Sequence, residues 1–99
     1  MIRHTVFFRL KGDAAAGKVA ALFEECEQFP SLHGGMRNFI IGRNISERDQ
    51  TFEWAFSVDF DNEAELKTYL NSDLHEQDVT ERFRPIVESR AIVSYVVEP

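Results

Sequence analysis

The sequence predicts an α+β domain of the ferredoxin-like β-α-β-β-α-β type, built on a four-stranded antiparallel sheet. Segments typical of strands, rich in apolar and β-branched residues, stand at 2–10, 36–43, 51–60 and 90–97. Two stretches with apolar residues at three- and four-residue spacing separate the first two and the last two of these segments. This order matches the split β-α-β arrangement, in which both helical regions cover one face of the sheet. At 99 residues we expect a single domain, 1–99.

The opening strand, residues 2–10, alternates between two faces. One face carries Ile2, His4, Val6, Phe8 and Leu10. A helix is predicted over 14–29, with Asp13 as its N-cap and Pro30 as its end. Its apolar side is made of Val19, Leu22, Phe23, Cys26 and Phe29.

The two middle strands, 36–43 and 51–60, are joined by a polar turn. In the second of them the apolar residues Phe52, Trp54, Phe56, Val58 and Phe60 alternate with Glu53, Ala55, Ser57 and Asp59. The face of the sheet away from the helices would then carry Thr5 and Phe7 of the first strand and Glu53, Ala55, Ser57 and Asp59 of the third. Since that face is half polar, the pattern permits a dimer through it but does not demand one.

The second helical region is broken in two. A short helix capped at 61–62 ends near Leu70, and a second helix follows the break at 71–73, with Asp73 as N-cap and Glu76 at the third helical position. This second helix presents Val79, Phe83, Ile86 and Val87 on one side, and Pro85 bends or ends it.

Tyr69 and His75 stand on either side of this break, so a phenol and an imidazole meet at one junction. His4 adds a second imidazole from the first strand. Such a group could move a proton next to a carbonyl, with an imidazole as base and a hydroxyl donating to the enolate. The helix dipole favours a neutral His75 while nearby carboxylates favour the charged form, and the sequence leaves that balance open. The alternative to a catalytic site is that all three residues are structural. His75 would then pack at the start of its helix, Tyr69 would lie on a helix face, and His4 would be a core residue.

Bulky side chains beside these three residues are the predicted walls of a ligand pocket. They are Val6, Phe8, Phe23, Trp54, Phe56, Val79 and Phe83. Plain core packing is the alternative for every aromatic among them, because aromatic stripes at this spacing are normally core. His33, beside two glycines, is interpreted as a loop residue, and Cys26 as a small core residue.

Composition narrows the range of partners. A net charge of −6 without a basic cluster argues against nucleic acid, and the absence of a long apolar run argues against a membrane span. One cysteine excludes an internal disulfide, and nothing at the start resembles a signal peptide, so we expect a cytoplasmic protein. No Gly-rich phosphate loop and no recognised metal-ligand spacing is present, so no cofactor and no metal are expected.

Four stretches, at 2–11, at 56–60 with 62–66, at 69–75, and at 83–87 with 93–95, resemble the stress-responsive dimeric α/β-barrel (Dabb) family of the dimeric α+β barrel superfamily. The resemblance implies a homodimer whose open sheet faces meet in a closed eight-stranded barrel. A plant polyketide cyclase in that family closes rings by aldol chemistry beside an apolar cavity. By position, its Tyr and His fall on Tyr69 and His75, with His4 also lining the cavity. Antibiotic-biosynthesis monooxygenases share the scaffold, and some need no cofactor.

Three functions follow as hypotheses. The first is a stress-associated homodimer that binds a small apolar ligand between sheet and helices. The second is a cofactor-independent enzyme, a polyketide cyclase-like or monooxygenase protein, with His75 as general base and Tyr69 as hydrogen-bond donor. The third is a purely structural dimer without a ligand, which needs no cavity.

Overall fold

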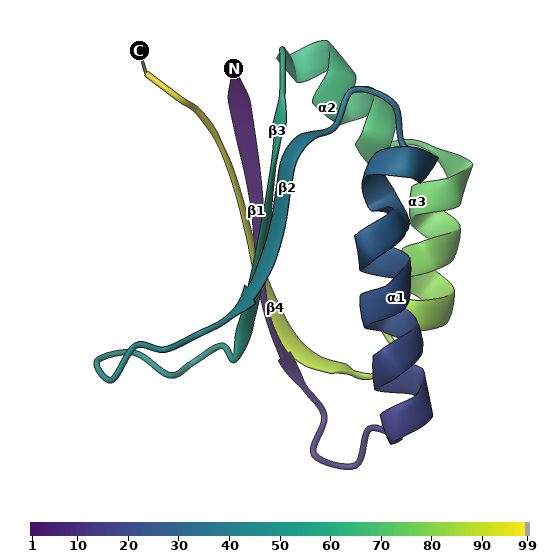
Figure 1. Ribbon diagram of the computed structural model, residues 1–99, viewed down its shortest axis with the longest axis vertical. Helices are drawn as coiled ribbons and strands as arrows, with labels where there is room; N and C mark the ends of the chain where they lie inside the picture. Colours follow the sequence, from purple (N-terminus) through teal and green to yellow (C-terminus); the bar gives the residue numbers. More distant parts are fainter. Residues whose placement is uncertain (99) are drawn as a thin grey trace.

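A computed structural model describes residues 1–98 and confirms the ferredoxin-like order (Figure 1). Its elements are β1 (Ile2–Leu10), α1 (Ala16–Leu32), β2 (Arg37–Arg43), β3 (Trp54–Phe60), α2 (Glu63–Leu70), α3 (Asp73–Asp78), a π-helical turn η1 (Val79–Phe83) and β4 (Val87–Val96). The strands form one antiparallel sheet in the order β2-β3-β1-β4. Of the described residues, none lies in a helix long and apolar enough to cross a membrane.

The helices lie together on one face of the sheet and leave the other face uncovered (Figure 1). Alternate residues of β1 and β3 fill the space beneath them, because successive side chains of a strand point to opposite faces. Phe8, Val58 and Phe60 are almost completely buried there, as is Leu22 of α1. The core therefore sits between the two central strands and the helices.

The helix α1 runs past Pro30, which was predicted to end it. The helix continues to Leu32, and the backbone N–H of His33 donates to the carbonyl of Phe29 over 2.9 Å. Both Phe29 and His33 are buried, so packing against the core holds the extra turn. At the other end Ala15 is the N-cap, without a side-chain hydrogen bond, and the predicted cap at Asp13 is wrong.

The break between α2 and α3 is capped by Ser72 rather than by the predicted Asp73. The Ser72 hydroxyl donates to the carbonyl of Tyr69 (2.9 Å) and accepts from the backbone N–H of His75 (3.1 Å). One hydroxyl can do both, since it carries one donor and two acceptor lone pairs. His75 is consequently the third helical residue, and the two ends of the break are tied together.

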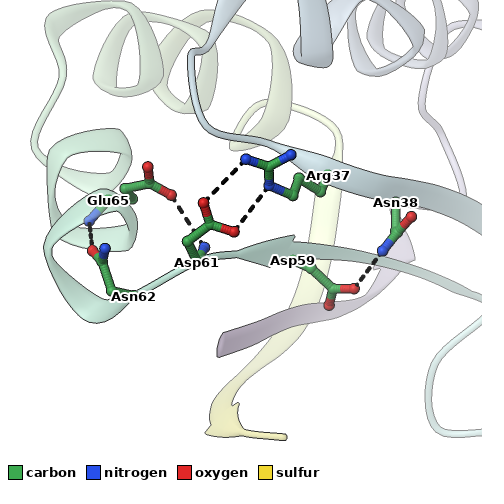
Figure 2. Close-up of polar contacts among 6 residues, drawn as sticks. All are labelled: Arg37, Asn38, Asp59, Asp61, Asn62 and Glu65. Carbon is green, nitrogen blue, oxygen red and sulfur yellow. Dashed lines mark hydrogen bonds and ion pairs between the residues drawn. The ribbon is translucent and has the colours of Figure 1, made fainter. Parts of the chain in front are cut away.

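At the start of α2 the predicted cap is confirmed, and it lies beside an exposed ion pair (Figure 2). Asn62 Oδ1 accepts from the backbone N–H of Glu65 (3.0 Å), while Glu65 Oε2 accepts from the backbone N–H of Asp61 (3.1 Å). Arg37 on β2 donates two hydrogen bonds to the Asp61 carboxylate, at 2.9 and 3.0 Å.

The uncovered face is more apolar than predicted, because β2 and β4 add to it. Ile40 is 64% exposed, and Val93 and Tyr95 are nearly half exposed, all on this face by strand register. The predicted polar residue Asp59 is instead buried beneath Arg3.

Candidate functional site

Tyr69 lies at the centre of an aromatic cluster that includes every histidine of the chain. Its ring centroid is 4.4 Å from that of His75, 4.8 Å from that of His33 and 6.1 Å from that of His4. Phe60 stacks on its other side at 5.6 Å. The phenol is thus buried among imidazoles contributed by β1, by the end of α1 and by α3.

His33 was interpreted from the sequence as a loop residue, and that interpretation is wrong. It caps α1, it is buried, and it packs edge-on against both Phe29 and Tyr69. The two glycines that follow it suggested a loop. The buried residue four positions earlier, Phe29, was the signal that the helix continues onto the core.

A cavity of about 180 Å³ lies beside this cluster, between the sheet and the helices. Tyr69, His75 and His4 all line it. The rest of its lining is mostly apolar, from Val6, Leu22, Cys26, Phe29, Phe56, Leu70, Val79, Phe83 and Ile92, with Glu76, Asp78, Arg84 and Arg90 as the charged members. The structure thus brings the phenol and both imidazoles of the sequence hypothesis to one hollow.

Of the predicted pocket walls, four line this cavity: Val6, Phe56, Val79 and Phe83. The other three lie elsewhere in the core, outside its lining. Phe8 packs edge-on against Phe83 at 5.4 Å, while Phe23 packs on Trp54 at 4.7 Å toward the far end of the sheet. Phe8 and Trp54 lie on the correct face of the sheet but two residues along their strands from the lining residues Val6 and Phe56. Phe23 of α1 packs against both Phe8 and Trp54.

His4 is a buried histidine with a side-chain partner. Its Nδ1 is hydrogen-bonded to the hydroxyl of Ser94, on the neighbouring strand β4, at 2.8 Å. Burial lowers the pKa of His4 to about 4, and the nearby His75 adds to this effect. His4 is therefore neutral at pH 7, with one nitrogen bonded to Ser94 and the other available.

His75 is half-buried, and burial lowers its pKa as well. The neighbouring His33 acts in the same direction, while Glu76 acts against it without outweighing burial. The sequence left the charge state of His75 open, and the structure favours the neutral imidazole. Burial also lowers the pKa of His33. All three imidazoles around Tyr69 share the neutral form at pH 7.

The Tyr69 hydroxyl and the Cys26 thiol, both beside the cavity, stay protonated at neutral pH. Burial raises the pKa of the Tyr69 hydroxyl above its ordinary value, and it raises the pKa of the Cys26 thiol to about 12. Tyr69 is therefore a hydrogen-bond donor rather than a base. Cys26 is a small apolar wall residue and not a nucleophile.

Asp78 is the cavity residue whose role sequence reasoning missed. It lies one helical turn after His75, is 5% exposed, and lines the same cavity. Its Oδ1 is the one fully buried side-chain oxygen or nitrogen of residues 1–98 that no protein group hydrogen-bonds. Arg82 approaches that oxygen only to 4.0 Å, and burial raises the pKa of the carboxyl to about 6.

The cluster thus offers neutral bases, a protonated phenol and a carboxyl around one small, largely apolar space. Such a set can bind a small molecule by hydrogen bonds and can move a proton on it. A metal site is not formed, since no three His, Cys, Asp or Glu among residues 1–98 are grouped to hold an ion.

A second hollow, of about 680 Å³, lies on the uncovered face of the sheet. Thr5, Phe7, Ser57 and Ala91 form its floor, and the β2–β3 connection forms one side. No histidine lines this hollow, and its lining surface is mostly apolar. Its position on the uncovered face sets it apart from the cavity around Tyr69.

Comparisons with known proteins agree on one family. The family model for the stress responsive A/B barrel domain, Dabb, matches residues 2–97. A Dabb-family protein with a ferredoxin-like fold from Mesorhizobium loti is 28% identical, with a TM-score of 0.85 over 99% of this chain and 97% of its own. None of the curated proteins searched matches the chain.

Two further solved structures share the fold. A dimeric protein of unknown function with a ferredoxin-like fold from Bacteroides fragilis is 26% identical, with a TM-score of 0.72 over 95% of this chain and 93% of its own. A hydroxynitrile lyase from Passiflora edulis is 19% identical, with a TM-score of 0.87 over 98% of this chain and 93% of its own.

Proposed function

We propose, from the premise that this chain belongs to the stress responsive A/B barrel domain (Dabb) family, that it is a homodimeric single-domain protein binding a small apolar ligand in the cavity around Tyr69. The observation that carries this proposal is the convergence of Tyr69, His4 and His75 on one hollow of about 180 Å³. For scale, an apolar cavity of about 150 Å³ holds benzene. A purely structural module would have no use for such a space.

The uncovered sheet face supports the homodimer. Exposed Ile40, Val93 and Tyr95 give it a large apolar area, of the kind that marks interaction sites. The relative from Bacteroides fragilis, which shares the fold, is itself described as dimeric. Two copies that meet through this face would cover the hollow of about 680 Å³.

Sedimentation velocity tests the dimer. We expect the wild-type protein to sediment as a dimer and Val93→Glu, which places a charge on the uncovered face, to sediment as a monomer with an unchanged circular dichroism spectrum. Glu88→Gln, an exposed change at the start of β4, is the matched control and should remain dimeric. A monomeric wild-type protein would remove this part of the proposal.

Titration with toluene, followed in a nitrogen–proton correlation spectrum, tests the ligand site. We expect shifts at backbone amides around Tyr69, His75 and Val79, and none on β2. Val79→Phe adds bulk at the cavity wall and should abolish the shifts, while Gln77→Phe, at an exposed position of α3, should keep them. Equal shifts in both variants would place the toluene elsewhere and refute the site.

The neutral His75 beside the protonated Tyr69 favours a second candidate function, cofactor-independent catalysis that starts with a proton transfer and continues either as an aldol addition or, with molecular oxygen as the oxidant, as a monooxygenation. In this function His75 takes a proton from a carbon next to a carbonyl, and Tyr69 donates a hydrogen bond to the oxygen that becomes negative. No metal or redox partner is needed for that step.

Deuterium exchange at the α-carbon of phenylacetone distinguishes catalysis from binding. A positioned general base contributes about 100-fold or more, so His75→Gln should slow the exchange by that factor if the protein is an enzyme. Tyr69→Phe should slow the exchange yet leave toluene binding unchanged. A wild-type rate equal to that in buffer would leave only the binding function.

The remaining parts of the proposal concern surroundings and partners. A cytoplasmic location accords with Cys26, which is buried and forms no disulfide within residues 1–98. The net charge of −6 disfavours nucleic acid as a partner.

A further inference from the structure

We propose that the cavity ligand carries a hydroxyl group, which donates a hydrogen bond to Asp78, so that the natural ligand is a small aromatic or aliphatic alcohol rather than a hydrocarbon. This inference rests on the proposed binding function and adds the chemical class of the ligand.

The first argument is the orphaned oxygen. Buried polar side-chain atoms are almost always hydrogen-bonded, and an unpaired one in a native protein needs an explanation. Asp78 is 95% buried, yet no protein group of residues 1–98 donates to its Oδ1. Arg82 stays 4.0 Å away, beyond hydrogen-bond range. A ligand hydroxyl would supply the missing donor.

The second argument is the direction of the side chain. Asp78 lines the same cavity as His75, three residues earlier on α3, and as Cys26 across on α1. Residues three apart lie on one side of a helix, so the carboxyl and the imidazole face the same space. A molecule in that space would meet an acceptor on Asp78 and apolar surface around it.

The third argument is charge. Arg84 and Arg90 also line the cavity, and both are exposed. Glu76 and Asp78 line it too, so the lining holds two cations and two acids and gives a charged amine, the other common donor to a carboxylate, no net attraction. Desolvating an ammonium group in this largely apolar space is costly, whereas a neutral hydroxyl avoids that cost and still forms a charge-assisted hydrogen bond with the carboxylate.

A matched pair of probes tests this inference. The compounds 4-ethylphenol and 4-ethyltoluene have nearly the same shape, and only the first carries a hydroxyl. Calorimetric titration at pH 7.5 gives the selectivity, the Kd of the toluene divided by the Kd of the phenol. Replacing Asp78 by Leu should lower this selectivity by about tenfold or more, the size expected for a hydrogen bond to a charged acceptor.

Two further variants complete the experiment. Asp78→Asn keeps an acceptor oxygen without the charge, so its selectivity should fall between those of the wild type and Asp78→Leu, and it serves if the Leu variant does not fold. Asp73→Asn removes an exposed carboxylate of the same helix, outside the cavity lining, and should leave the selectivity unchanged.

The outcomes separate this inference from the proposed function. Binding of both probes with the same selectivity in the wild type and Asp78→Leu would show that solvent satisfies Asp78 and would overturn the inference alone. Failure of both probes to bind the wild-type protein would overturn the binding function, and the inference with it.

Discussion

Two aspartates, Asp59 on the uncovered side of the sheet and Asp78 on α3 at the covered side, are buried to almost the same degree but differ in their hydrogen bonds and in their pKa. Asp59 is 1% exposed and Asp78 is 5% exposed. Asp59 accepts two hydrogen bonds from Arg3, at 2.8 and 3.1 Å, and one from Asn38 at 2.9 Å (Figure 2 shows the Asn38 contact). These contacts lower its pKa, whereas burial without a hydrogen bond raises that of Asp78 to about 6.

The difference shows how a buried carboxyl is used. On the uncovered face, Arg3 and Asn38 cover Asp59 and make it part of the framework. At the cavity, Asp78 has no such cover and contributes an unused acceptor. An ionised carboxyl that is buried without partners costs stability, so such a group is retained where it serves a ligand.

The largest effect that this comparison predicts is the loss of the Asp59 network. Asp59→Asn removes the charge and turns one acceptor into a donor that faces other donors, so it should lower the free energy of unfolding by about 3 kcal/mol. Urea unfolding at pH 7 and fixed protein concentration measures this.

The loss should shrink as the pH falls. Because the folded pKa of Asp59 lies below the unfolded value, its contribution is full above the unfolded value and disappears as the pH falls through the folded one. A loss that stays constant from pH 7 to pH 2 would show that shape, not charge, holds this face.

Asp78→Asn should have the opposite sign. The folded pKa of Asp78, about 6, lies above its unfolded value of 3.8. Its protonated form therefore stabilises the fold below pH 3.8, and that stabilisation is lost as the pH rises through about 6. At pH 8 the variant should be more stable than the wild type by about 2–3 kcal/mol, and at pH 3 the two should coincide.

Chemical unfolding of both proteins across this pH range provides the measurement, with Asp73→Asn as the exposed control. The three histidines around Tyr69 titrate in the same range with the opposite slope, since their folded pKa values are lowered. They are present in both proteins and cancel in the difference. A destabilised Asp78→Asn at pH 8 would mean that Arg82 satisfies the carboxylate after all.

A smaller effect is expected for His75→Ala. The backbone N–H of His75, not its ring, bonds to the Ser72 cap, so the helix start survives the change. We expect a loss of about 1 kcal/mol or less and a cooperative thermal transition. A melt without cooperativity would show that the ring holds the fold.

The smallest effect is expected at the exposed pair of Arg37 and Asp61, in spite of its good geometry. Water screens both partners, so Arg37→Gln should leave the thermal midpoint unchanged within error. A clear drop would show that the edge of the sheet depends on this pair, as the open face depends on Asp59.

The sequence predicted the fold well because alternation and helical spacing are strong local signals. The residues of β1 were placed at 2–10, as observed, and the order of strands and helices along the chain was predicted, with the second helical region broken in two. The caps were less predictable, because Ser72 and Asp73 are both good N-cap residues and only tertiary packing decides between them.

The site was only partly predictable for a related reason. Tyr69 and His75 flank a visible break, so their meeting could be expected. The burial of Asp78 could not, because charged residues are rarely buried and the two residues before it on α3, Glu76 and Gln77, are polar and exposed. Asp59 was placed on the correct face, but its cover by Asn38 depends on a left-handed backbone, with φ of 53°, that no pattern of residue types reveals.

The alternation of β1 has a consequence for how such proteins diversify. Thr5 and Phe7 face the open side of the sheet, while His4 and Val6 face the cavity. Adjacent codons therefore specify two independent surfaces. Mutations at His4 or Val6 can change which ligands the cavity binds while the uncovered face stays constant. Protein engineering could use the same separation to change one side of the sheet at a time.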